Sequence, residues 1–116
     1  MKLGEICFLT NDVPRLASFY RQLLGMDDDC SDPIHQTLIA EETMLTIYND
    51  GTRKENNNHN MCIAFTVENM DDAYQQVHAL GAQILQPPAR QPWGTVNMCF
   101  LDPDNNQVYL RCFPKE

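Results

Sequence analysis

Positive charge is scarce in this chain of 116 residues, which has eight lysine and arginine residues against sixteen aspartate and glutamate residues. The formal net charge is therefore −8 when the histidines are counted as neutral. A surface of this sign repels the phosphates of nucleic acids and the anionic headgroups of lipids. We accordingly expect neither a nucleic acid nor a membrane among the partners of this protein.

Long apolar runs and cysteine motifs are also missing. No segment approaches the roughly 18 apolar residues that a membrane-spanning helix needs, and the amino-terminal MKLGEICFL has no secretory cleavage pattern. The five cysteines are odd in number and widely spaced, without a CxxC pair or a cysteine–histidine spacing typical of zinc sites. These absences favour a cytoplasmic protein with reduced thiols.

The sequence contains no glycine-rich phosphate loop and no GxSxG nucleophile elbow. Its content of hydrophobic residues, 43%, and of charged residues, 21%, is typical of a globular protein. The length is that of a single domain. What the chain does contain is an internal repeat.

The repeat joins two segments with the same layout, Glu5–Met26 and Cys62–Leu85. Each begins with an alternating strand, continues through a polar turn into a helix with an apolar stripe, and ends in Leu-Gly. The polar segment Asn49–Asn60 separates the copies, so that module one spans about residues 1–52 and module two about residues 60–116.

The ends of both helices can be predicted from local signals. Asn11 or Asp12 can cap the first helix, with Pro14 in its opening turn, where a missing N–H costs nothing. Gly25 suits the left-handed residue that ends this helix. Asn69 caps the second helix.

Shorter extended runs follow each helix, so each half reads as βαβββ and the whole as α+β. A helix covers only one face of each small sheet. We therefore expect the two modules to form one domain, with their sheets curled around a shared cavity that holds a small ligand.

On these features the chain resembles the vicinal oxygen chelate superfamily, which includes glyoxalase, bleomycin-resistance proteins and extradiol dioxygenases. The resemblance is carried by NDVPRLASFYRQLLGM, IAFTVENMDDAYQQVHALGAQI and PWGTVNMCFLDPDNNQVYL, and it covers essentially the whole chain. It implies a glyoxalase/bleomycin-resistance-like fold. In metal-using members, the ligands come from the first and last strand of each half.

The positions that match those ligands are Glu5, Leu45, Cys62 and Tyr109. Divalent metals of such enzymes need imidazole and carboxylate donors, whereas a leucine offers none and a neutral phenol is a poor ligand. The resemblance therefore implies a cavity lined by Leu45 and Tyr109 that holds neither a metal nor another cofactor.

Strand alternation and the resemblance add further residues to the expected ligand-binding set. Glu5 could act as a base, meet a cationic ligand group, reach solvent or pair with Arg111. The Arg111 side chain could instead bind a carboxylate or phosphate, or lie along the surface. Trp93, in the proline-rich loop PPARQPWGTV, could stack on an aromatic ligand or pack against the protein. The remaining expected lining residues are Cys7 and Ile47.

The favoured hypothesis is a homodimeric protein that binds a small organic molecule without a metal, similar to bleomycin-resistance-type sequestering proteins. The alternative is a glyoxalase- or dioxygenase-like metalloenzyme that holds nickel, zinc or iron through donors outside the expected positions, such as His35 or His59. A third possibility is a partner-binding domain whose cavity is filled by its own side chains.

Overall fold

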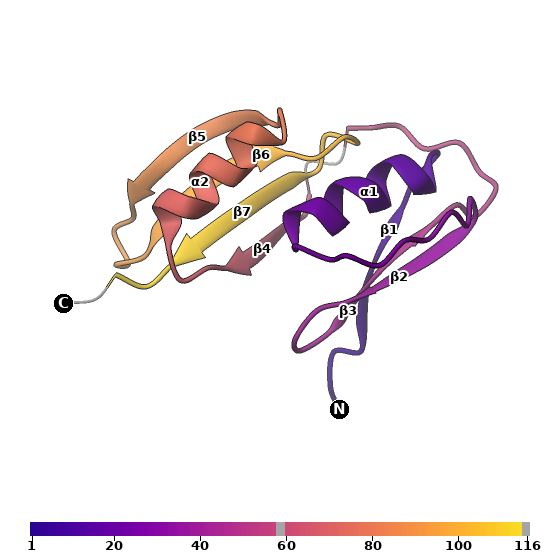
Figure 1. The fold of residues 1–116 in the computed structure, drawn as a ribbon, viewed down its shortest axis with the longest axis horizontal. Helices are drawn as coiled ribbons and strands as arrows, with labels where there is room; N and C mark the ends of the chain where they lie inside the picture. Colours follow the sequence, from indigo (N-terminus) through magenta and orange to yellow (C-terminus); the bar gives the residue numbers. More distant parts are fainter. Residues whose placement is uncertain (58–59, 115–116) are drawn as a thin grey trace. The chain divides into compact units, whose positions relative to one another are not determined.

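The computed structural model describes residues 1–57 and 60–114, and the chain divides into two compact units, Met1–Glu55 and Asn56–Glu116 (Figure 1). The first unit contains β1 (Glu5–Leu9), α1 (Val13–Leu23), β2 (His35–Ile39) and β3 (Met44–Tyr48). The second contains β4 (Cys62–Thr66), α2 (Met70–Ala79), β5 (Gln83–Arg90), β6 (Val96–Leu101) and β7 (Gln107–Cys112). The predicted α+β class is confirmed. That the two units form one domain remains a prediction.

Each unit is a small sheet with one helix packed on one face (Figure 1). In the first sheet the strand order is β1-β3-β2, with β1 parallel and β2 antiparallel to β3. In the second sheet the order is β4-β7-β6-β5, with β4 parallel to β7 and the other neighbours antiparallel. Helix α1 contacts β2 and β3, and helix α2 contacts β5 and β7. The opposite face of each sheet is here called its open face.

The first unit has one strand fewer than the expected βαβββ pattern. Residues 26–34, MDDDCSDPI, contain no strand. Aspartate has a low preference for strands, and proline cannot donate a hydrogen bond to a neighbouring strand. The two units therefore share the position of the helix and a parallel strand pair, β1–β3 in the first and β4–β7 in the second. The first unit lacks a strand between α1 and β2.

Both helices begin and end as the sequence predicts. Asp12 caps α1 by accepting a hydrogen bond from the Arg15 N–H at 3.2 Å, and Asn69 caps α2 in the same way. Gly25 has φ of 67°, in the left-handed region that favours glycine after a helix.

A buried arginine joins helix α1 to β2 in the first unit. The side chain of Arg21 is 10% exposed, and its Nη1 donates a hydrogen bond to Gln36 Oε1. Gln36 in turn donates to the carbonyls of Cys30 and Asp32, at 3.1 Å and 3.0 Å, which anchors the acidic segment. Arg21 Nε also lies 3.2 Å from Asp28, but that carboxylate is largely exposed and adds little.

Replacing Arg21 with methionine should lower the free energy of unfolding by about 1–3 kcal/mol, because the Oε1 atom of the buried Gln36 side chain loses its hydrogen-bond donor. Urea denaturation followed by circular dichroism measures the effect. Arg15→Met is the matched control, since Arg15 is exposed on the same helix. Equal losses in the two variants would show that the Arg21–Gln36 contact contributes nothing.

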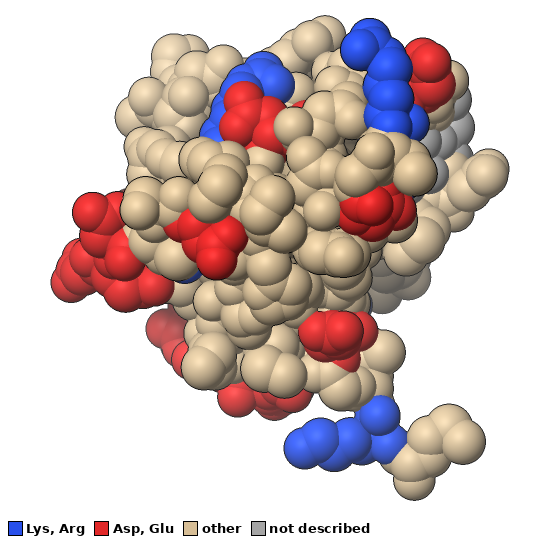
Figure 2. Space-filling view, turned by 90° about the vertical axis from the view of Figure 1, so that its right-hand side faces the viewer, with Lys and Arg blue, Asp and Glu red and all other residues tan. Residues whose placement is uncertain are grey.

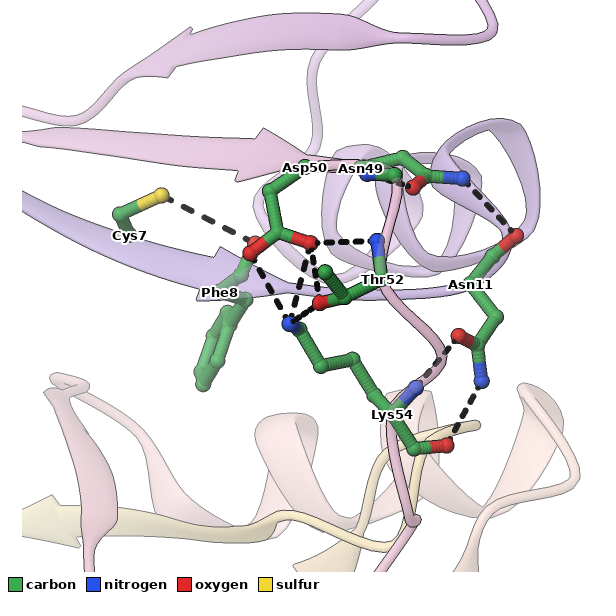
Figure 3. Close-up of polar contacts among 8 residues, drawn as sticks. Cys7, Phe8, Asn11, Asn49, Asp50, Thr52 and Lys54 are labelled. Atoms are coloured by element: carbon green, nitrogen blue, oxygen red, sulfur yellow. Dashed lines mark hydrogen bonds and ion pairs between the residues drawn. The ribbon is translucent and has the colours of Figure 1, made fainter.

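A polar cluster closes the chain segment after β3 (Figure 3). Asn11 donates to the Lys54 carbonyl and accepts from the Lys54 N–H, both at 2.8 Å, so its side chain pairs with the backbone like a neighbouring strand. Lys54 Nζ lies 2.9 Å from Asp50 Oδ2, and the Thr52 hydroxyl donates to Asp50 at 2.7 Å. These contacts fix residues 50–54 against the start of α1.

The same cluster predicts a dependence of stability on pH. Hydrogen bonds from Thr52 and Lys54 lower the pKa of Asp50 from 3.8 to about 2. A depressed pKa stabilises the folded state above the ordinary value, and this stability is lost as pH falls from about 4 through about 2. In that window wild type should lose stability relative to Asp50→Asn. Thermal unfolding of both proteins measures the difference, and parallel curves would contradict the assignment.

Candidate functional site

The open face of the second sheet carries a group of thiol, hydroxyl, amide and guanidinium side chains. The pairing of β4, β7 and β6 arranges it in rows that run across these strands. The tyrosine row is Ala64, Tyr109 and Cys99, and the arginine row is Thr66, Arg111 and Asn97. A third row contains Cys62, Gln107 and Leu101.

Tyr109 lies at the centre of this face between two thiols. Its phenol shares a side-chain hydrogen bond with Cys99, which raises the pKa of Tyr109 above its ordinary value. Burial raises the pKa of the Cys99 thiol more than the hydrogen bond with Tyr109 lowers it, and the nearby Cys62 raises it further. Both groups are therefore neutral near pH 7. The tyrosine row thus offers a hydrogen-bonding phenol between two weakly polar residues, Ala64 and Cys99.

The arginine row has a defined geometry. Arg111 Nε donates a hydrogen bond to the Thr66 hydroxyl oxygen at 3.1 Å, and the guanidinium carbon lies 5.4 Å from the centre of the Phe113 ring. On the other side, Asn97 Oδ1 accepts a hydrogen bond from the Thr95 hydroxyl at 2.8 Å. These contacts orient the charged and amide groups at one end of the face.

In the first sheet, Glu5 and Cys7 lie on the open face, as strand alternation predicts. The Thr46 hydroxyl donates a hydrogen bond to Glu5 Oε2 at 2.6 Å. Burial and the adjacent Glu5 carboxylate raise the pKa of the Cys7 thiol. The thiol is therefore protonated near pH 7, which makes it a weak nucleophile.

The expectation that Leu45 and Ile47 line the open face is wrong. Leu45 pairs with Ile6 and Ile47 with Phe8, so all four side chains share the face that α1 covers. Leu45 is 3% exposed and Ile47 is fully buried. The open-face residue between them is Thr46, whose contact with Glu5 confirms its direction.

Trp93 lies in the turn between β5 and β6 and is 69% exposed. The predicted loop is shorter than expected, because Pro87 and Pro88 belong to β5. Two irregularities of pairing between β5 and β6 fall around these prolines, which cannot donate to β6. Gly94, with φ of 103°, forms the turn directly after the indole.

The donors of these faces do not fit a nickel, zinc or iron centre. Among residues 1–57 and 60–114, no three histidine, cysteine, aspartate or glutamate side chains are placed to hold an ion together. Glu5 is accompanied by a threonine hydroxyl, and Cys62 by a neutral phenol. His35 lies in the row of Tyr48, four residues along the sheet from that of Glu5, which is roughly 13 Å. His59 lies outside the described residues.

Three residues of these faces were not predicted, namely Thr46, Asn97 and Cys99. Each occupies a position where a polar or thiol group interrupts an apolar run. In TVNMCFL, alternation from Asn97 would have placed Cys99 and Leu101 beside it. The signal is weak because Met98 and Phe100 on the covered face are as apolar as their neighbours.

The model of the Glyoxalase/Bleomycin resistance protein/Dioxygenase superfamily matches residues 2–110, and the chain therefore belongs to this superfamily. Among curated proteins, the uncharacterized protein YraH of Bacillus subtilis (strain 168) is 27% identical over an alignment 126 positions long, gaps included, that covers 95% of this chain and 97% of YraH.

Solved structures agree on the fold. A glyoxalase/bleomycin resistance protein/dioxygenase family enzyme from Burkholderia phytofirmans PsJN superposes with a TM-score of 0.82 at 17% identity, covering 98% of this chain and 100% of that one. Lactoylglutathione lyase from Agrobacterium tumefaciens gives 0.73 at 18% identity, covering 96% and 92%. At these identities the likeness shows the fold alone. In the described part of the chain, neither helix is long and apolar enough to cross a membrane.

Proposed function

We propose that this protein binds a small organic molecule without a metal, in the manner of the bleomycin-resistance-type branch of its superfamily. The observation that carries the proposal is the chemistry of the second open face. A neutral phenol and two thiols, one of them shielded, occupy the region where a metal-using relative needs charged or imidazole donors. Such a surface suits an organic ligand that is held by contact area and a few directional hydrogen bonds.

The proposed ligand-binding residues are those of the open faces and the turn beside them. Tyr109 would orient the ligand through its hydroxyl, and Trp93 would offer a flat apolar ring. We further propose that the protein acts in the cytoplasm as a homodimer. The remaining members of the proposed set are Glu5, Cys7, Cys62 and Arg111.

The first test is the metal content of protein purified without chelator. We expect less than a stoichiometric amount of nickel, zinc, iron or manganese by plasma mass spectrometry. Stoichiometric metal would overturn the proposal and favour a glyoxalase- or dioxygenase-like enzyme. The second test is a thermal-shift screen against metabolites and antibiotics, bleomycin included, because a ligand that binds only the folded state raises the melting temperature.

Tyr109→Phe should weaken binding of a compound found in that screen by roughly three- to tenfold, because one hydrogen bond to the ligand is lost. Isothermal titration calorimetry measures the dissociation constant. Tyr74→Phe is the control, since Tyr74 lies on helix α2 and contacts His78. If both variants bind as wild type does, Tyr109 is not part of the binding surface.

A further inference from the structure

We infer that the arginine row is a subsite for an oxyanion, so that the ligand carries a carboxylate or phosphate group beside an apolar body. The inference rests on the proposed function and names the chemical class of its ligand. It comes from the juxtaposition of Thr66, Arg111 and Asn97 on three neighbouring strands. Neighbouring strands lie about 4.8 Å apart, a spacing that one oxyanion can bridge.

The guanidinium of Arg111 is oriented but not neutralised. Thr66 accepts from Nε and the Phe113 ring lies against the guanidinium, which leaves both terminal nitrogens available. In the part of the chain that the structure describes, Arg111 forms no ion pair with a carboxylate. A planar guanidinium held in this way binds a carboxylate or phosphate through two parallel hydrogen bonds, at little cost in side-chain entropy.

The neighbours of Arg111 add donors. The Thr66 oxygen accepts from Arg111, so the Thr66 hydroxyl hydrogen remains free to donate. The Thr95 hydroxyl donates to Asn97 Oδ1, which assigns the amide NH₂ of Asn97 as a donor that remains available. A hydroxyl, a guanidinium and an amide thus form one row of donors with no carboxylate in it.

The adjacent tyrosine row indicates that the rest of the ligand is apolar. Ala64 presents apolar surface on one side of the Tyr109 phenol, and the buried Cys99 lies on the other side. A ligand whose oxyanion meets Arg111 would place its apolar body over this row, about two residues or roughly 7 Å along β7. The subsite thus predicts an aromatic or aliphatic acid rather than a free inorganic anion.

The net charge of −8 opposes an anionic ligand only weakly at physiological salt. Acidic side chains are spread over the surface seen in Figure 2, and lysine and arginine side chains are fewer. Screening at physiological salt confines such repulsion to about 8 Å, whereas the hydrogen bonds in the arginine row act in direct contact. The hydrogen bonds from the arginine row therefore contribute more to binding an anion than the net negative charge of the protein opposes.

The test uses probes that share one apolar body: 2-naphthoate, 2-naphthyl phosphate and the neutral 2-naphthamide. Isothermal titration calorimetry should show that wild type binds at least one of the two anions roughly tenfold or more tightly than the amide. The anion that binds more tightly shows whether the subsite prefers a carboxylate or a phosphate. Arg111→Gln should abolish this preference by weakening the binding of the preferred anion at least tenfold more than it weakens the binding of 2-naphthamide.

Arg90→Gln is the matched control, because Arg90 pairs with Val96 on the other face of the same sheet. It should retain the full preference for the anion. Thr66→Val keeps the Arg111 charge but removes the acceptor that orients it, and it should reduce the preference by roughly threefold. This second variant keeps the test valid if Arg111→Gln folds poorly.

The outcomes separate the two proposals. Equal binding of amide and anions by wild type would overturn the oxyanion subsite and leave metal-independent ligand binding standing. Undiminished anion preference in both Arg111→Gln and Thr66→Val would also overturn the subsite. No binding of any probe at millimolar concentration would overturn the subsite, whereas the metal analysis and the thermal-shift screen decide separately on metal-independent ligand binding.

Discussion

Replacing Leu45 with alanine is expected to lower the free energy of unfolding by about 2–5 kcal/mol. The side chain is 3% exposed and packs on the face of the first sheet that α1 covers, so its truncation leaves a cavity. Leu45→Glu should be more damaging still, because it places an unpaired carboxylate in the same space. Chemical denaturation of the purified variants measures both effects.

Met44→Ala is the control for this prediction. Met44 is the preceding residue on β3, points to the open face and is 39% exposed, so its truncation should cost no more than about 1 kcal/mol. Equal costs at the two positions would contradict the assigned strand direction. A larger cost at Met44 would restore the original expectation that Leu45 faces the ligand.

Replacing Asp102 with alanine should cost about 3 kcal/mol of stability. Asp102 is 4% exposed and holds the turn between β6 and β7. One carboxylate oxygen accepts hydrogen bonds from the N–H groups of Asp104 and Asn106, and the other accepts from the Asn106 side chain. Alanine leaves all three donors without this partner, and each buried donor that stays unpaired costs about 1–3 kcal/mol, less where water reaches it.

Thermal unfolding compares Asp102→Ala with Asp102→Asn and Asp29→Ala. The asparagine retains one acceptor and should lose about half as much stability. Asp29 is exposed in the acidic segment before β2, and its removal should change stability by no more than about 0.5 kcal/mol. An unchanged melting temperature in Asp102→Ala would show that the turn needs no side-chain acceptor.

The parts of the fold that depend on local chemistry could be predicted. Helix caps at Asp12 and Asn69, the left-handed Gly25 and the positive φ of Asn105 at 63° all follow from residue types that satisfy backbone groups nearby. These signals operate within a few residues and need no knowledge of the rest of the chain. The helical repeat followed from them directly.

Which side chains of β3 face helix α1 could not be predicted in the same way. In MLTIY both alternating sets contain apolar residues, so burial alone does not decide between Leu45 and Met44. The parallel register of β3 with β1 settles the direction, and that register depends on contacts distant in sequence. Thr46, the polar residue at the centre of the strand, was the informative signal.

The arginine and tyrosine rows show the same limit. Strand alternation gave the inward positions of Tyr109 and Arg111 on β7, but not their neighbours on β6. Cys99 and Asn97 join the candidate site through the register of a hairpin, which depends on how Asp102 closes its turn. The composition of this open face is therefore a property of strand pairing rather than of a sequence motif.

The two prolines of β5 have a consequence for how copies of this chain can associate. β5 is an outer strand of the second sheet, and Pro87 and Pro88 remove two successive N–H groups from it. A strand that added to this edge of the sheet would lack a hydrogen-bond donor at the prolines. The edge formed by β5 therefore resists edge-to-edge growth into fibrils or other open-ended assemblies. Two copies that paired their sheets through backbone hydrogen bonds would have to use an edge strand other than β5.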